Sequence, residues 1–233
     1  MRAFIIIVSL MLLPSQVLAR ECAMKQPTQI NVQPIAKEVQ FDTSQTLSQI
    51  QGQSSSLNNP YGFHRSTITQ GFMKGVIKVV PSVKLGGFSI PSQNKVCLWY
   101  DEINITIEVD PKIILAKEVY QNLCTRRSVT KHEMKHVEAD RRAVNKFSRR
   151  VGQRVHQDLE RRGFKVGYIP ISQKEQAIKR MQRVVFDIVQ DEYKRLETDR
   201  AKEQKAIDTL EEYERVSAEC PDSQRLIQKR WKR

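Results

Sequence analysis

The chain has 233 residues, of which 39% are hydrophobic, and a formal net charge of +13. This length is sufficient to bury one hydrophobic core. The charge favours anionic envelope polymers such as lipopolysaccharide or teichoic acids, although charged faces of helices are also commonly just solvated. The chain lacks the aromatic and basic modules of RNA and DNA binders, which argues against nucleic acid as a partner.

The N-terminus has the pattern of a secretory signal peptide, which we place at residues 1–19. Arg2 precedes an apolar run over residues 4–13, and residues 17–19 provide a cleavage site after Ala19. The apolar run is too short to span a bilayer comfortably, and no later segment approaches a transmembrane span. We therefore expect a secreted or periplasmic protein, with an uncleaved N-terminal anchor as the alternative.

The cysteines are Cys22, Cys97, Cys124 and Cys220. An even number in an exported chain predicts two disulfide bonds, for which three connectivities exist. We favour Cys97 with Cys124 and Cys22 with Cys220, although the sequence does not decide between the connectivities. The absence of a Cys-x-x-Cys pair argues against a thiolate zinc site or a redox site.

The first half of the mature chain is predicted to be polar at first and then rich in strands. Residues 20–60 form a polar segment with a short strand, a short helix opened by Ser44 and a loop over residues 52–60. Residues 61–110 contain a β-branched run at 76–80, an apolar run at 96–100 and a strictly alternating run at 103–109. Short strands joined by short turns predict a small antiparallel sheet.

Residues 111–218 are predicted to be helical. Asp110 and Pro111 suit the start of a helix that reaches Asn122. Residues 128–162 repeat apolar side chains every three to four positions and end before Gly163. A capping box at residues 172–175 opens a long third helix, whose first half packs antiparallel on the previous one. The apolar pattern continues weakly to Val216, and residues 219–233 form a basic tail.

The central motif is His132-Glu133-Met134-Lys135-His136. Residues four apart lie on one face of a helix, so both imidazoles can reach one Zn²⁺ ion. The glutamate beside the first histidine is then placed to act as general base on a water molecule that the metal activates. A chain with only four histidines rarely contains this spacing by chance.

Two structural interpretations compete with the metal site. Thr130 and Glu133 have the spacing of a capping box, and the histidines could be solvated side chains on a basic helix. The helical geometry favours the metal, because His132 and His136 share a face with the apolar residues Ala143 and Phe147.

A catalytic zinc ion needs a third protein ligand. Asp140 is the first candidate because it continues the four-residue spacing, either as a ligand or as a residue that orients a ligating histidine. The other candidates are Asp191, Glu192 and Asp199 on the third helix and His64 after the polar loop.

These segments together resemble a bacterial family of predicted secreted zinc-dependent proteases. The resemblance covers residues 39 to about 205 and is carried by residues 41–47, 59–67, 103–111 and 129–136, of which only the HExxH motif is specific. It implies a zincin-like peptidase. The chain departs from the family at Lys135, where the family usually has glycine, and at its later Tyr-Asp and His-Gly element, where Asp199 is the nearest substitute.

We therefore predict an α+β fold, in which residues 61–218 form a zincin-like metallopeptidase domain with a small antiparallel sheet, the HExxH helix and a long C-terminal helix. His132 and His136 would bind Zn²⁺, Glu133 would be catalytic, and the substrate would be a protein or the peptide stems of a cell wall. The alternative is a non-catalytic basic envelope binding or assembly protein with a degenerate or structural metal site. A nuclease or nucleic-acid binder is a third, less supported hypothesis.

Overall fold

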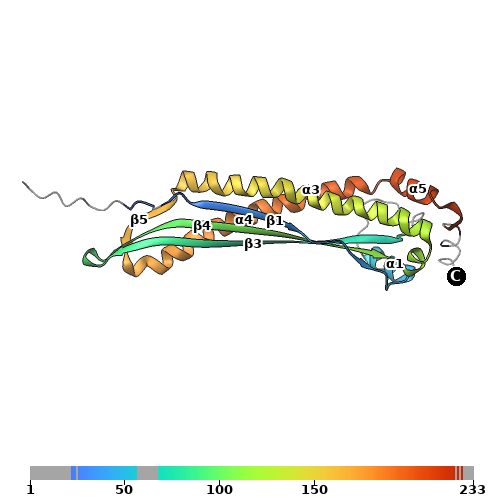
Figure 1. Ribbon diagram of the computed structural model, residues 1–233, viewed down its shortest axis with the longest axis horizontal. Helices are drawn as coiled ribbons and strands as arrows, with labels where there is room; N and C mark the ends of the chain where they lie inside the picture. Colours follow the sequence, from blue (N-terminus) through green and yellow to red (C-terminus); the bar gives the residue numbers. More distant parts are fainter. Residues whose placement is uncertain (1–21, 25, 57–67, 224, 226, 228–233) are drawn as a thin grey trace, which may run out of the picture.

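The computed structural model describes residues 22–24, 26–56, 68–223, 225 and 227, so the expected signal peptide lies outside the described residues (Figure 1). Its elements in chain order are β1 (Gln29–Ala36), β2 (Gln40–Asp42), α1 (Leu47–Ser56), β3 (Gly71–Ile90), the 3₁₀ turn Pro91–Gln93, β4 (Lys95–Leu115), α2 (Lys117–Tyr120), α3 (Leu123–Arg162), β5 (Lys165–Pro170), the 3₁₀ turn Ile171–Gln173, α4 (Lys174–Ile207) and α5 (Leu210–Ala218).

The sheet is a long five-stranded ribbon organised around β4. Strands β1 and β2 pair with β4 in parallel along one edge, where β5 also pairs with it, in antiparallel fashion. Strand β3 pairs antiparallel with β4 along the opposite edge, over almost its whole length. The predicted small antiparallel sheet is therefore wrong, since the ordered strands β1, β4 and β2 are parallel. Strands β1 and β2 are short and largely exposed. Both lie in the polar segment 20–60, for which only one short strand was predicted.

The predicted helix that begins at Pro111 is also wrong. Strand β4 continues through Pro111 to Leu115, and only the single turn α2 follows it. The inward-facing side chains keep a period of two through Val109, Pro111 and Ile113, which outweighs the local helix-start signal. On this edge of β4, the pairing with β1 ends at Val109 and the pairing with β2 begins at Lys112. Pro111 lies between these two positions, so no neighbouring strand on that edge requires the N–H that proline lacks.

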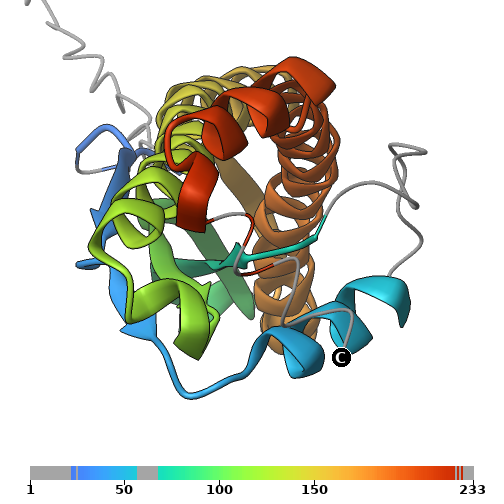
Figure 2. The same cartoon turned by 90° about the vertical axis from the view of Figure 1, so that its right-hand side faces the viewer.

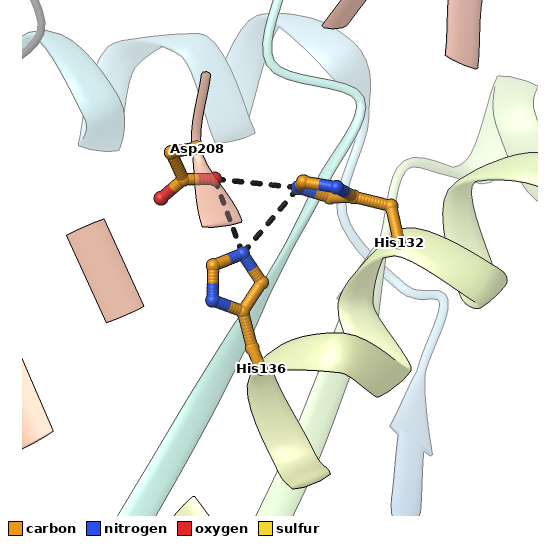
Figure 3. A group of neighbouring side chains, drawn as sticks. All are labelled: His132, His136 and Asp208. Atoms are coloured by element: carbon orange, nitrogen blue, oxygen red, sulfur yellow. Dashed lines mark hydrogen bonds and ion pairs between the residues drawn. The ribbon is translucent and has the colours of Figure 1, made fainter. Parts of the chain in front are cut away.

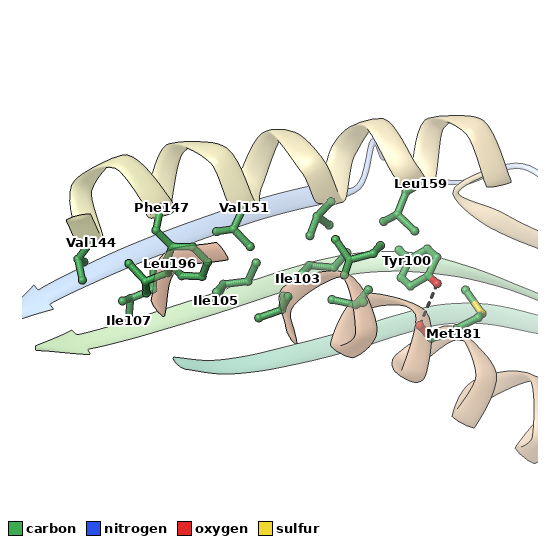
Figure 4. Close-up of a cluster of buried hydrophobic side chains, with 14 of the residues drawn as sticks. Tyr100, Ile103, Ile105, Ile107, Val144, Phe147, Val151, Leu159, Met181 and Leu196 are labelled. Atoms are coloured by element: carbon green, nitrogen blue, oxygen red, sulfur yellow. Dashed lines mark hydrogen bonds between the residues drawn. The ribbon is translucent and has the colours of Figure 1, made fainter. Parts of the chain in front are cut away.

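Helices α3 and α4 cover one face of the ribbon and run antiparallel side by side (Figures 1 and 2). At 40 residues, α3 is about 60 Å long. Ile103, Ile105 and Ile107 of β4 pack against the apolar faces of the two helices, among them Phe147 and Leu196 (Figure 4). Burial of these apolar side chains stabilises the elongated shape.

The start of α3 differs from the prediction, and its end agrees with it. The helix begins at Leu123, where the side chain of Asn122 accepts a hydrogen bond from the backbone N–H of Thr125 at 3.1 Å. Thr130 therefore lies inside the helix, and the capping-box interpretation of Thr130 and Glu133 is wrong. Gly163 follows the last helical residue with a φ of 85°, a conformation that favours glycine.

The disulfide bonds join Cys22 to Cys97 and Cys124 to Cys220, so the pairing that we favoured is wrong. The first bond fixes the N-terminal segment to β4, and the second fixes the start of α3 to the residues after α5. Two disulfide bonds are typical of proteins in oxidising compartments. Among the described residues, no helix combines the length and apolar character that crossing a membrane requires.

Candidate metal centre

One stripe of α3 faces the C-terminal helices in a regular antiparallel ladder. Every fourth residue of α3, from its first turn to its middle, meets a residue of α4, α5 or their connections. The facing pairs are Cys124 with Cys220, Ser128 with Val216, His132 with Glu212, His136 with Asp208, and Asp140 with Gln204. Four-residue spacing on both sides is what two antiparallel helical segments in contact produce.

A break between α4 and α5 brings an aspartate to the two histidines. Helix α4 ends at Ile207, Asp208 leaves the helical conformation, and Thr209 caps α5 by accepting a hydrogen bond from the N–H of Glu212 at 3.2 Å. Since the backbone changes direction at this point, the carboxylate of Asp208 is directed at α3 (Figure 3).

The three potential ligand atoms form a nearly regular triangle. Nε2 of His132 and Nε2 of His136 are 3.4 Å apart, and Oδ1 of Asp208 lies 3.3 Å from the first and 3.1 Å from the second. A tetrahedral Zn²⁺ ion with bonds of about 2.0–2.1 Å holds its nitrogen and oxygen ligands about 3.3 Å apart. The separations within the triangle therefore match those of a tetrahedral zinc site, and these three residues could hold a metal ion.

Both imidazoles have a hydrogen-bond partner on the ring nitrogen that faces away from this triangle. Nδ1 of His132 lies 3.2 Å from a carboxylate oxygen of Glu212, and Nδ1 of His136 contacts the amide oxygen of Gln204. These acceptors can hold the ring proton at Nδ1, and in that tautomer Nε2 is a lone-pair donor for a metal ion. The same arrangement fixes the orientation of each ring.

The electrostatics keep Asp208 ionised. Burial alone would raise the pKa of Asp208, but the hydrogen bonds from the two imidazoles outweigh it and hold the pKa well below its ordinary value. Burial likewise opposes a positive charge on each histidine, whereas the hydrogen bond to Asp208 raises the pKa of both rings above the ordinary value. The centre therefore attracts positive charge, either as protons on the rings or as a metal cation.

Glu133 is buried beside the triangle, with 3% of its surface exposed. Burial raises the pKa of its carboxyl to about 7, although both histidines and a hydrogen bond from the backbone N–H of Met73 oppose the shift. A carboxyl with a pKa near neutrality can both accept and return a proton at physiological pH. Glu133 thus has the proton affinity expected of a general base.

The predicted third ligands lie elsewhere. Asp140 is fully buried and forms two contacts with Arg200, at 2.7 and 2.8 Å. Asp191 is exposed and pairs with Lys194, while the buried Glu192 pairs with Arg150. Asp199 pairs with Lys146 and Arg150, so it does not substitute for the missing family element. His64 lies outside the described residues.

Asp140 instead supports the centre indirectly. It accepts a hydrogen bond at 2.6 Å from the amide nitrogen of Gln204, whose amide oxygen contacts His136. Arg200, which holds Asp140, also donates to the backbone oxygen of Gly75 at 2.9 Å. A chain of contacts thus runs from the edge of β3 through Asp140 and Gln204 to a ligating ring.

We expect Gln204→Ala to weaken zinc binding by about 10- to 100-fold while the protein stays folded, because residues that orient metal ligands have effects of this size. Zinc affinity measured by competition with a chromophoric chelator tests this. Gln190→Ala, on the exposed surface of the same helix, is the control and should bind zinc as the wild type does. An unchanged affinity in Gln204→Ala would show that the amide does not orient His136.

The disulfide between Cys124 and Cys220 holds the residues that follow α5 against the first turn of α3. We expect its removal in the Cys124→Ser/Cys220→Ser double variant to lower zinc affinity and to reduce stability by about 2–4 kcal/mol. The matched control is Cys22→Ser/Cys97→Ser, which removes the bond at β4 and should reduce stability while leaving the zinc affinity of the folded protein unchanged. Equal zinc affinities in the two variants would contradict a role for the Cys124–Cys220 bond in positioning Asp208.

Comparison of the chain with known protein families, with curated proteins and with solved structures found no match. The resemblance to secreted zinc-dependent proteases therefore stays a prediction from the motif. The geometry of the metal centre is the structural observation that bears on function.

Proposed function

We propose that the chain is a zinc-dependent metallopeptidase that acts outside the cytoplasm. The observation that carries the proposal is the convergence of His132, His136 and Asp208 on one point, at the separations that tetrahedral Zn²⁺ requires, beside the buried Glu133. Two imidazoles and one carboxylate are a donor set that suits zinc.

The number of ligands favours catalysis. Catalytic zinc sites use three protein ligands and keep the fourth position for water or substrate, whereas structural sites are closed by four. When bound here, Zn²⁺ would act as a Lewis acid that polarises a peptide carbonyl and makes water acidic enough to ionise near neutral pH.

The residues of the chain would divide the remaining work. His132, His136 and Asp208 hold the ion, while Glu212 and Gln204 fix the two rings. Glu133 takes the proton from the attacking water and returns it to the amine that leaves when the peptide bond breaks. Burial, which raises its pKa to about 7 in the metal-free site, increases its affinity for that proton.

The substrate class that we propose is a protein or the peptide stems of a cell wall. The two disulfide bonds support an oxidising, extracytoplasmic location, and the net charge of +13 favours an anionic surface. The predicted signal peptide supports the same secreted or periplasmic location.

One observation favours a second candidate, a non-catalytic envelope protein with a structural metal centre. His132 and His136 are only 6% and 7% exposed, and the centre joins α3 to the C-terminal helices. A metal ion in this position would stabilise the helical ladder in the absence of any turnover.

The test is a measurement of zinc content and peptide hydrolysis on the purified mature protein. We expect about one zinc per chain and cleavage within a library of quenched fluorescent peptides. Treatment with 1,10-phenanthroline should abolish the cleavage, and added Zn²⁺ should restore it. Bound zinc without cleavage of any protein, peptide or cell-wall substrate would favour the structural centre, and a folded protein that binds no zinc would exclude both candidates.

A further inference from the structure

A groove of about 670 Å³ lies at the start of α3. This end of α3 lies at the end of the molecule that carries α1 and α5 (Figure 1). The residues that line it come from β2, the end of β4, α2 and the first turns of α3. They are Phe41, Thr43, Leu115, Tyr120, Leu123, Arg126, Arg127, Thr130 and Lys131. At about 100° per residue, the side chains of Leu123, Arg126 and Arg127 point away from the helix face that carries His132 and His136. The groove is therefore separate from the metal centre.

Large apolar side chains are unusually exposed in this groove. Phe41, Tyr120 and Leu123 are 52%, 41% and 63% exposed, and they are three of the eight large apolar residues that the described part of the chain leaves open to solvent. Single exposed apolar residues need no explanation, but a cluster within one groove is typical of a binding surface.

The charges in the groove are all positive. Its lining contains Arg126, Arg127 and Lys131 and, within the part of the chain that the structure describes, no carboxylate. The guanidinium of Arg126 lies 4.9 Å from the centre of the Tyr120 ring, an arrangement that keeps its donors available. No described carboxylate forms an ion pair with either arginine, whereas Lys131 pairs with Glu219 at 3.4 Å.

The carboxylates nearest in sequence are already engaged. Asp42 pairs with Lys112 at 3.0 Å and accepts hydrogen bonds from Ser44. Glu118 accepts a hydrogen bond from the backbone N–H of Leu47 at 3.0 Å. The positive charge of the two arginines is therefore not neutralised locally.

We propose that this groove docks an acidic segment of another protein, with an aromatic or aliphatic side chain against Phe41, Tyr120 and Leu123 and with carboxylates on Arg126 and Arg127. Arginine guanidinium groups bind carboxylates through paired hydrogen bonds. A polyanion such as a phosphate polymer offers nothing to the apolar side chains, which is why the combination of groups favours a polypeptide. The proposal does not depend on peptidase activity.

The test measures, by fluorescence anisotropy, the binding of the fluorescein-labelled peptide Asp-Glu-Phe-Glu-Leu-Asp to the mature protein. The protein carries Glu133→Gln so that any peptidase activity does not cleave the peptide. We expect saturable binding that the Arg126→Glu/Arg127→Glu double variant weakens by at least about tenfold, because it reverses the charge that meets the carboxylates. We expect Leu123→Ser to weaken binding several-fold through loss of apolar contact. Circular dichroism verifies that each variant is folded.

The matched control is Arg142→Glu/Arg149→Glu, which makes the same change of charge on the exposed surface of α3 away from the groove. It should bind the peptide as well as the parent protein does. Equal losses in the two double variants would show that only net charge matters and would overturn the proposal. The proposal would also be overturned if Leu123→Ser bound the peptide normally and polyphosphate with the same charge as the peptide displaced it fully. Those two results together would indicate a polyanion site.

Discussion

Replacement of Asp208 by alanine is expected to remove stoichiometric zinc binding. The loss of zinc affinity should exceed about 100-fold, the largest effect usual for residues that only orient a metal ligand. The substitution deletes the only carboxylate of the triangle and leaves two imidazoles, which are too few for a stable tetrahedral site in the protein. Metal content of the purified variant and competition with a chromophoric chelator measure the effect.

Asp199→Ala is the control for this variant. Asp199 is an aspartate of α4, and it pairs with Lys146 and Arg150 rather than with the histidines. Zinc binding at the wild-type level in Asp199→Ala, with loss in Asp208→Ala and in His136→Ala, would establish the ligand set. If Asp208→Ala retained full affinity, the third ligand would have to be another residue and the proposed centre would be wrong.

The sequence was sufficient to predict the helix that carries the motif, because a period of 3.6 is explicit in the apolar residues of α3. Its face, its end at Gly163 and its antiparallel partner α4 are as predicted. The same local reasoning failed at Asp110 and Pro111, where a helix-start signal lies within a strand. The pairing of β4 with the 20 residues of β3 decides the conformation there, and such long-range pairing is not visible in a local pattern.

The third ligand could not be predicted from spacing along α3 alone, since it comes from a helix break 72 residues after His136. A signal was nevertheless present. Thr209 and Glu212 have the spacing of a capping box, which marks the start of a new helix and therefore a break just before it. Reading the apolar pattern as one helix through Val216 concealed this break. The parallel pairing was missed for a different reason. Strand β1 alternates Ile30 and Val32 with polar residues, but its partner β4 lies far along the chain, and a local pattern does not show which strands pair.

Replacement of Glu133 by glutamine is expected to lower kcat by about 10²- to 10⁴-fold, the usual contribution of a general base. The amide has the shape of the carboxyl but cannot take a proton from water. Zinc content should be unchanged, because Glu133 is not one of the three ligating residues. The fold should also be retained, since the substitution replaces a buried carboxyl, whose pKa is already raised, with a neutral group.

Glu138→Gln provides the matched control on the same helix. Glu138 is half-exposed and pairs with Arg141 at 2.7 Å, so its substitution should leave kcat unchanged. Measuring kcat and zinc content together separates the two candidate functions. Loss of turnover with retained zinc assigns the proton transfer to Glu133 and requires that the fourth position of the ion is reached by substrate. Turnover that survives in Glu133→Gln would exclude Glu133 as the base. The buried glutamate would then have a structural role, through its hydrogen bond with the backbone of Met73, which joins α3 to β3.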